Sequence, residues 1–221
     1  LVPVNISFFD EGSFGRAIKS MGPVFRAGLC VSDLVAVARG GESFGEYVVP
    51  EGKIGLATVC SLVINGALLK AGIPIDSKFG GILQIRDRDP VRFVELIHYA
   101  GSSLDPSEVF ISAKMTSVGQ AAREGCGRIL ANFREIPAPC RYISDGVIAR
   151  LKEARMNGAM VIGETSEAVC EVPIELNRIG MILLGGLNPV AAAAEDGILV
   201  ESHAMSTVMD YRSLVKFEEL E

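Results

Sequence analysis

One stretch of sequence that occurs twice decides the fold. Residues 53–85 read KIGLATVCSLVINGALLKAGIPIDSKFGGILQI, and residues 178–210 read RIGMILLGGLNPVAAAAEDGILVESHAMSTVMD. With the chain aligned to itself at an offset of 125 residues, seven of the 33 positions from Ile54 to Arg86 are identical. In both copies an apolar strand leads through a short loop into a helix, and a glycine ends that helix before a second strand begins. The repetition predicts an internal duplication.

The repeat predicts an α+β fold of duplicated ferredoxin-like (α/β plait) sandwich units. Two strand–helix–strand units with many hairpin signals and no G-x-G-x-x-G fingerprint fit plaits better than a doubly wound sheet. We expect a single domain over residues 1–221, built from two related halves at about 1–105 and 106–221. The alternative is that any strand–helix–strand unit would align about as well.

Local signals outside the repeat predict further elements. Asp89-Pro90 has the form of an N-cap followed by proline at the first helical position, which predicts a helix to about Ala100. Three more expectations are a short helix at 16–20, a strand at 108–113 (EVFISA) and a strand at 171–176 (EVPIEL). Ser144 is expected to cap a helix that runs to Met156.

Composition limits the class of protein. The 221 residues are 49% hydrophobic and 22% charged, which suffices for a sizeable core and argues against a disordered chain. The net charge of −6 argues against a nucleic-acid-binding surface. No uninterrupted run of about 18 apolar residues predicts a membrane span, and the start at Leu1 suggests an excised piece without a signal peptide. Five cysteines without a C-x-x-C pair are typical of reduced thiols in a cytoplasmic protein.

The two repeat loops are the best candidates for a ligand site. Each loop leads into a helix, whose first N–H groups and positive dipole end attract an anion such as a carboxylate or phosphate metabolite. Lys78 and His203 occupy matching positions of the repeat and are candidates to pair with the same anion. The candidate ligand-binding residues are therefore Thr58, Cys60, Ser61, Asn65, Lys78, Gly185, Gly186, Asn188 and His203. Helix capping, close packing and a solvated surface lysine are the alternatives.

No motif predicts catalysis or metal binding. A P-loop, a G-x-S-x-G elbow and an H-E-x-x-H pair are missing, and two histidines do not favour a zinc cluster or a Cys60–His dyad. We therefore expect no catalytic residue, no metal and no cofactor. In the segment RDRDPVR, residues 86–92, arginines alternate with aspartates, which predicts solvated ion pairs rather than a phosphate groove.

Longer strings carry a resemblance to a known family. The segments are GSFGRAIKSMGPVFRAGL, ATVCSLVINGALLKAGIP, FGGILQI, REIPAPC and RIGMILLGGLNP. In these segments, and over nearly its whole length, the chain resembles the regulatory domain of the archaeal nitrogen repressor NrpR. Proteins of that family join an N-terminal winged helix to one or two such domains, act as dimers, and release DNA when 2-oxoglutarate accumulates.

The resemblance implies a function for this chain. It is expected to be the effector-sensing and dimerising domain of a cytoplasmic repressor of nitrogen-assimilation genes, with 2-oxoglutarate as inducer and effector. Its partners would be 2-oxoglutarate and a second copy of the chain. DNA contact is expected only through a separate winged-helix domain that this chain lacks.

Two alternatives come from other classes of protein. One is a small-molecule enzyme that acts on a carboxylate metabolite, and it would require turnover or a buried His or Cys with a strongly shifted pKa. The other is a purely structural dimerisation module, which would have an apolar face and no pocket at the repeat loops.

Overall fold

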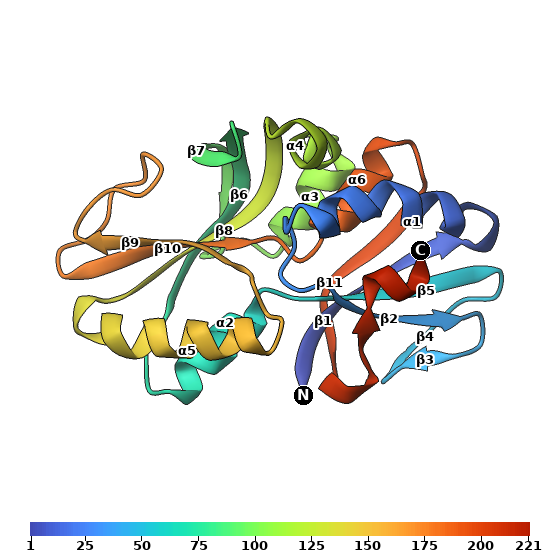
Figure 1. The fold of residues 1–221 in the computed structure, drawn as a ribbon, viewed down its shortest axis with the longest axis horizontal. Helices are drawn as coiled ribbons and strands as arrows, with labels where there is room; N and C mark the ends of the chain where they lie inside the picture. Colours follow the sequence, from blue (N-terminus) through green and yellow to red (C-terminus); the bar gives the residue numbers. More distant parts are fainter.

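The computed structural model describes residues 1–221 and contains two five-stranded antiparallel sheets that lie side by side (Figure 1). The first sheet has the strand order β11-β1-β5-β2-β12, with bounds Val200–Met209, Val2–Asp10, Lys53–Val59, Leu34–Arg39 and Val215–Lys216. The second has the order β7-β6-β8-β10-β9, with bounds Asp89–His98, Asp76–Arg86, Gly127–Pro137, Arg178–Leu184 and Ala159–Thr165. A small hairpin of β3 (Ser43–Phe44) and β4 (Tyr47–Val48) flanks the first sheet.

Six α-helices cover and connect the sheets. Their bounds are α1 Glu11–Arg26, α2 Leu62–Lys70, α3 Pro106–Ser112, α4 Val118–Glu124, α5 Arg141–Glu153 and α6 Asn188–Glu195. Three 3-10 turns complete the chain, at Ala138–Cys140, Tyr211–Ser213 and Phe217–Leu220. None of these helices combines the length and the hydrophobicity that crossing a membrane requires.

The chain crosses from one sheet to the other inside each copy of the repeat. β5 belongs to the first sheet, but the helix and strand that follow it, α2 and β6, belong to the second unit. β10 belongs to the second sheet, and α6 and β11 return to the first (Figure 1). Each sheet is therefore completed by a strand from the other half of the chain.

This exchange gives both sheets the same internal order. β11-β1-β5-β2 in the first matches β6-β8-β10-β9 in the second, and each reads as strands four, one, three and two of a ferredoxin-like plait. The predicted α+β class is confirmed. The division into halves at about 1–105 and 106–221 stays a prediction, since each sheet takes strands from both.

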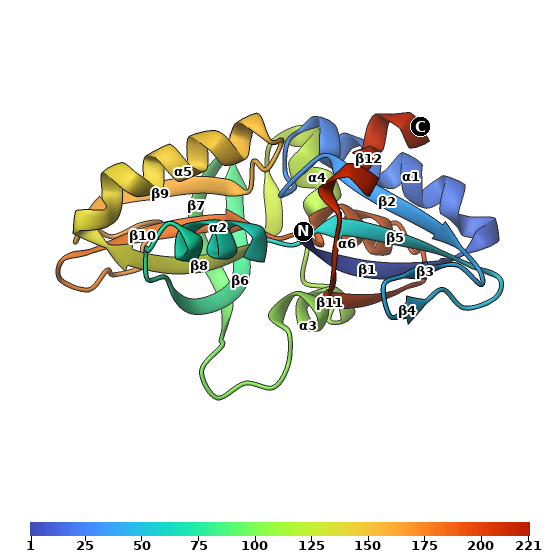
Figure 2. The same cartoon turned by 90° about the horizontal axis from the view of Figure 1, so that it is seen from below.

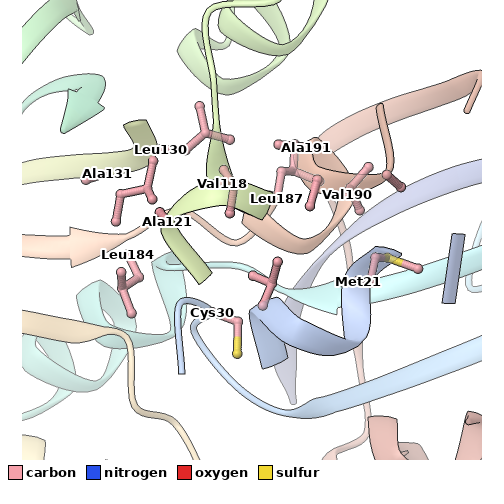
Figure 3. Close-up of a cluster of buried hydrophobic side chains, with 14 of the residues drawn as sticks. Met21, Cys30, Val118, Ala121, Leu130, Ala131, Leu184, Leu187, Val190 and Ala191 are labelled. Atoms are coloured by element: carbon pink, nitrogen blue, oxygen red, sulfur yellow. The ribbon is translucent and has the colours of Figure 1, made fainter. Parts of the chain in front are cut away.

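The hydrophobic core is continuous across the junction of the two units. Met21 of α1 and Val190 of α6 pack with Val118 of α4, and Leu130 of β8 and Leu184 of β10 belong to the same cluster (Figure 3). Each sheet also has a helical layer of its own, because α1 contacts α6 beside the first sheet and α2 contacts α5 below the second (Figures 1 and 2). Burial of this apolar surface joins the units into one body.

The first helix is much longer than expected. The glycines at 12, 15 and 22 suggested only a short helix at 16–20, but α1 runs from Glu11 to Arg26. Its face with Ala17, Ile18 and Met21 is fully or almost fully buried against the core. Packing of this apolar stripe outweighs the low helix propensity of glycine.

The helix predicted after Asp89-Pro90 is wrong. Residues 89–98 form β7, which pairs with β6 across a tight turn at Asp87 and Arg88. Both turn residues have positive φ angles, 53° and 71°, as a two-residue hairpin loop of type I′ requires. The predicted strand at 108–113 is also wrong, because Asp105 caps α3 by accepting hydrogen bonds from the N–H groups of Ser107 and Glu108.

Two smaller expectations also differ from the structure. Residues 171–176 form a loop rather than a strand, because Cys170 and Glu171 have positive φ angles and turn the chain back on itself. α5 begins at Arg141 rather than after Ser144, and the Ser144 hydroxyl donates to the Arg141 carbonyl oxygen within the first turn.

One asparagine joins the two units at the crossover. Asn188, at the start of α6, is fully buried, and its side chain accepts from the Leu130 N–H at 2.8 Å and donates to the Leu130 carbonyl at 3.0 Å. Asn188 Oδ1 thus accepts from the Leu130 N–H where the pairing of β8 with β10 ends, and the Leu130 carbonyl accepts a further bond from the N–H of Gly185, the residue after β10.

Asn188→Ala should therefore destabilise the fold. It leaves the buried Leu130 N–H without its acceptor, so we expect the free energy of unfolding to fall by about 2–3 kcal/mol. Urea denaturation monitored by circular dichroism measures this change. Asn157→Ala is the control, because this exposed residue has no side-chain hydrogen bond, and equal losses in both variants would contradict the assignment.

Candidate functional site

A pocket of about 130 Å³ lies between the two units where the repeat loops meet. Both sheets contribute to its wall, together with the loops that precede α2, α3 and α6. The lining residues are Asn5, Cys60, Ser61, Leu62, Ser77, Tyr99, Asp105, Ser107, Asn132, Arg134, Gly186, Leu187, Ala204 and Met205. Since one water needs about 10–15 Å³, the pocket has room for a metabolite of on the order of ten non-hydrogen atoms.

Equivalent positions of the two halves face each other across this pocket. Val4 pairs with Val59 and Ala131 with Leu184, so Asn5 and Asn132, the next residues along β1 and β8, occupy corresponding places. The loops Cys60-Ser61 and Gly185-Gly186 are aligned in the repeat and lead into the N-termini of α2 and α6. The N–H groups of Val63, Ile64 and Asn188 donate to carbonyl oxygens within these first turns, and the positive end of each helix dipole attracts negative charge.

The wall of the pocket contains one cation, Arg134 of β8. Its side chain is only 3% exposed, yet no carboxylate lies within ion-pair distance of its guanidinium group. One nitrogen, Nη1, donates to the Phe133 carbonyl at 3.0 Å, whereas Nε has no hydrogen-bond partner. A buried charge is costly unless it is paired, so this group points to an anionic ligand.

A chain of side chains orients the guanidinium. The Tyr99 hydroxyl donates to Asn132 Oδ1 at 2.6 Å, and Asn132 Nδ2 donates to the Ser61 hydroxyl at 3.1 Å. The guanidinium carbon of Arg134 lies 4.8 Å from the centroid of the Tyr99 ring. Burial raises the pKa of Tyr99, so its phenol stays protonated and remains the donor to Asn132.

The other side of the pocket is closed by α3 and β11. α3 lies below the junction, against β6 and β11 (Figure 2). Its Glu108 accepts a hydrogen bond from the Ala204 N–H at 2.6 Å, and the Met205 N–H donates to Asn5 Oδ1 at 3.1 Å. Met205 has a positive φ of 50° where β11 shifts register against β1. Through these contacts α3 is bonded to β11, and β11 is bonded to β1, so this side of the pocket is held closed.

The structure brings three of the nine candidate residues to the pocket wall. Cys60, Ser61 and Gly186 line it. Thr58 and Asn65 lie behind the wall and support it. The Thr58 hydroxyl accepts from Asn5 at 3.4 Å, and Asn65 donates to the Ser77 hydroxyl at 3.3 Å.

The remaining four candidate residues have other roles. Gly185 packs against Leu130, and Asn188 holds the same residue by its two hydrogen bonds. Lys78 forms ion pairs with Asp76, Glu135 and Glu175. His203 is hydrogen-bonded to Glu201 at 3.1 Å and packs edge-on against Phe8. The shared register of Lys78 and His203 thus does not bring them to the pocket.

Cys60 does not have the properties of a nucleophile. Burial raises the pKa of its thiol, so the reactive thiolate is scarce at neutral pH. No histidine lines the pocket to act as its base. No group of three or more His, Cys, Asp or Glu side chains is placed to hold a metal ion. The site is suited to binding a small anion.

The residues that sequence reasoning missed come mainly from β8 and from the α3 segment. Asn132 and Arg134 lie at alternate positions of the mostly buried strand GRILANFREIP, so they share one face. Two polar residues on one face of a buried strand could have indicated the pocket from the sequence alone. Tyr99, Asp105 and Ser107 gave no such signal, because their place depends on β7 being a strand.

Comparison with known proteins identifies relatives over almost the whole chain. The family model described as NrpR regulatory domains NRD1 and 2 matches residues 1–216. The global nitrogen regulator NrpRI of Methanosarcina mazei is 38% identical over 96% of this chain, and the global nitrogen regulator NrpR of Methanocaldococcus jannaschii is 30% identical over 99%. The chain spans 65% and 36% of the lengths of these two relatives.

A solved structure has the same fold. The crystal structure of a nitrogen repressor-like protein from Methanococcus jannaschii matches with a TM-score of 0.79 and 29% identity. The match covers 98% of this chain and 88% of that one. These relatives are named as regulators and repressors, not as enzymes.

Gly186→Ala should close the pocket and destabilise the protein. A Cβ at this position would lie 2.5 Å from both Asn5 Nδ2 and the Val59 carbonyl oxygen, so the backbone must shift. We expect a loss of about 1–3 kcal/mol in the free energy of unfolding. In Gly66→Ala, the control within α2, the new methyl meets nothing within 4 Å, and stability should rise by up to about 1 kcal/mol. A neutral Gly186→Ala in urea denaturation would contradict the packing.

Proposed function

The chain belongs to the family of NrpR regulatory domains, and on this premise we propose that it is the effector-sensing domain of a nitrogen repressor. The effector that we propose is 2-oxoglutarate, bound between the two units. Recognition of the operator sequence is assigned to a separate winged-helix domain, and a cytoplasmic location and a homodimer are part of the same proposal. The names of the relatives support the regulatory role.

The observation that carries the choice of ligand is the buried Arg134 guanidinium. It offers planar, paired N–H donors to a carboxylate, and no protein carboxylate occupies them. The second carboxylate of a dicarboxylate would meet the N–H groups at the start of α2 or α6. The hydroxyls of Ser61 and Ser77 each accept a hydrogen bond from an asparagine amide, which leaves their own O–H groups to donate to the oxo group.

Binding at this place can change the relation between the units. The wall includes Asn5 and Met205 from the first sheet and Asn132 and Arg134 from the second, so one ligand contacts both. A ligand shifts a conformational equilibrium only by its difference in affinity for the two states. If the bound arrangement disfavours the DNA-binding form of the dimer, DNA must weaken 2-oxoglutarate binding by the same factor.

The proposal predicts that 2-oxoglutarate stabilises the chain against heat. A ligand that binds only the folded state at about 100 times its Kd adds roughly 2.7 kcal/mol, so Tm should rise steadily with concentration. Arg134→Gln should abolish the rise without lowering the Tm of the free protein, because it removes an unpaired buried charge. Arg128→Gln, an exposed position on the same strand, is the matched control and should keep the full response.

Two outcomes would contradict the effector proposal. One is a Tm that stays constant up to millimolar 2-oxoglutarate, and the other is an equal response in Arg134→Gln and the unaltered chain. Conversion of 2-oxoglutarate to another compound, followed by NMR during incubation with the protein, would instead favour the small-molecule enzyme. Binding without turnover separates the sensor from both that enzyme and a purely structural module.

The homodimer has its own test. Tyr142 and Ile143 on the first turn of α5 are 90% and 49% exposed, and Leu176 on the β9–β10 loop is 81% exposed. Asn177 accepts a hydrogen bond from the Ala138 N–H, which places that loop beside the segment that leads into α5. Exposed apolar side chains gathered in this way are typical of a protein interface.

The double variant Tyr142→Ser, Leu176→Ser should weaken self-association. We expect the dimer Kd to rise at least tenfold, measured by analytical ultracentrifugation, since loss of a central apolar contact costs about 1.4 kcal/mol or more. Leu69→Ser on α2, where Leu69 is 56% exposed, is the control. A chain that is monomeric at all concentrations, or a double variant that dimerises like the control, would contradict this surface.

A further inference from the structure

A second concave surface, at the far end of β6 and β8, has a basic lining. Its volume is about 410 Å³, and it includes Arg86, Lys114 and Arg128 but no carboxylate. Thr116 and Ser117 add hydroxyl groups from the segment that leads into α4, and Gln120 adds an amide from α4 itself. We call this surface the basic groove. It lies apart from the pocket around Arg134, with which it shares no lining residue.

Strand register extends the basic groove across three strands. Gln84 on β6 pairs with Arg92 on β7 and with Arg128 on β8, so all three side chains share one face of the sheet. Neighbouring strands are about 4.8 Å apart, which separates the backbones at Arg92 and Arg128 by about 10 Å. Arg86 lies two residues beyond Gln84, at the edge of the same surface.

The cations of the basic groove have no anionic partners within the chain. Lys78 and Arg178 form ion pairs elsewhere on the second sheet, whereas Arg86, Arg92, Lys114 and Arg128 form none. The solvated ion pairs predicted for residues 86–92 are therefore wrong. Asp89 lies opposite Arg86 in the hairpin and does not pair with it. The groove is locally positive on a chain whose net charge is −6.

The spread of these cations favours an extended ligand. All four side chains are exposed, and they come from β6, β7, β8 and the α3–α4 loop rather than converging on one buried point. A single phosphate held by the protein would require convergent donors. A row of exposed Arg and Lys side chains instead matches a polyanion with regularly spaced charges, as in the phosphate backbone of a nucleic acid.

We propose that the basic groove contacts the phosphate backbone of duplex DNA without reading its sequence. This inference rests on the proposed function, because a domain joined to a DNA-bound winged helix would meet DNA at a high effective concentration. Backbone contacts of this kind position a protein on the duplex and add affinity without specificity. The groove then contributes to the grip of the repressor on its operator, separately from the effector pocket.

Fluorescence anisotropy of a labelled duplex of arbitrary sequence, titrated with the 221-residue chain, tests the proposal. Binding should be detectable at about 50 mM salt and should weaken with salt, with a slope of log K against log[salt] of about −0.9 per neutralised phosphate. The double variant Arg86→Gln, Arg128→Gln should reduce the magnitude of this slope by about 1.8. Changing the duplex sequence should leave the affinity unaltered.

A matched variant controls for net charge. Arg16→Gln, Lys19→Gln on α1 removes the same number of exposed cations, neither of which is in an ion pair, and should leave the slope unchanged. Undetectable binding at low salt would overturn the proposal, and so would equal losses in the two double variants. Poly-glutamate that binds as tightly as DNA would assign the groove to an acidic protein instead. ATP that saturates the groove while DNA does not bind would assign it to a small phosphate ligand.

The DNA-binding experiment and the effector experiment have distinguishable outcomes. Arg134→Gln should keep the salt slope, and the Arg86→Gln, Arg128→Gln variant should keep the thermal response to 2-oxoglutarate. A chain that responds to 2-oxoglutarate but does not bind DNA would refute the groove alone. A chain that binds DNA with the expected slope but ignores 2-oxoglutarate would refute the effector alone.

Discussion

The exchange of strands between the two halves constrains every other part of the structure. β11 completes the sheet of β1, and β6 completes the sheet of β8, so neither sheet is whole without the other half of the chain. The two connecting segments must cross at the junction, which brings the starts of α2 and α6 together there. Asn188, bonded to Leu130 across the same junction, shows how closely backbone polar groups of the two units are joined.

The crossover explains why a polar pocket lies in the middle of the molecule. Apolar packing fills the sides of the junction, where Leu187 and Ala191 meet Val118 and Leu130 (Figure 3). The starts of α2 and α6 place the positive ends of their helix dipoles at the junction, and these favour negative charge over apolar packing. Arg134 adds a buried charge without a carboxylate partner. An anion would offset both, and such a ligand would couple the units that the exchange has interlocked.

Much of the fold follows from the sequence because the repeat is local. The strands, loop, helix and glycine of each repeat are encoded within about 33 residues and occur in the expected order. The dipeptide Asp-Pro shows the limit of local signals. Asp105-Pro106 starts a helix, as capping chemistry predicts, whereas Asp89-Pro90 lies in a strand because β6 offers a partner across a tight turn. Pairing between distant residues outweighs the local preference.

The site was predictable only in part for the same reason. The repeat loops pointed to Cys60, Ser61 and Gly186, which line the pocket, but register within the repeat could not show that Lys78 is held by carboxylates. From the sequence, Arg134 could be identified only as a charge within a buried strand. Tyr99, whose ring lies against its guanidinium, directly follows β7, and those residues were expected to form a helix.

A crystal structure of the chain with 2-oxoglutarate is the most direct test of an effector site between the two units. We expect the ligand between the two sheets, with one carboxylate within hydrogen-bond distance of the Arg134 guanidinium and the other near the start of α2 or α6. A ligand bound elsewhere in the molecule, or a pocket that stays free of it at saturating concentration, would refute this site.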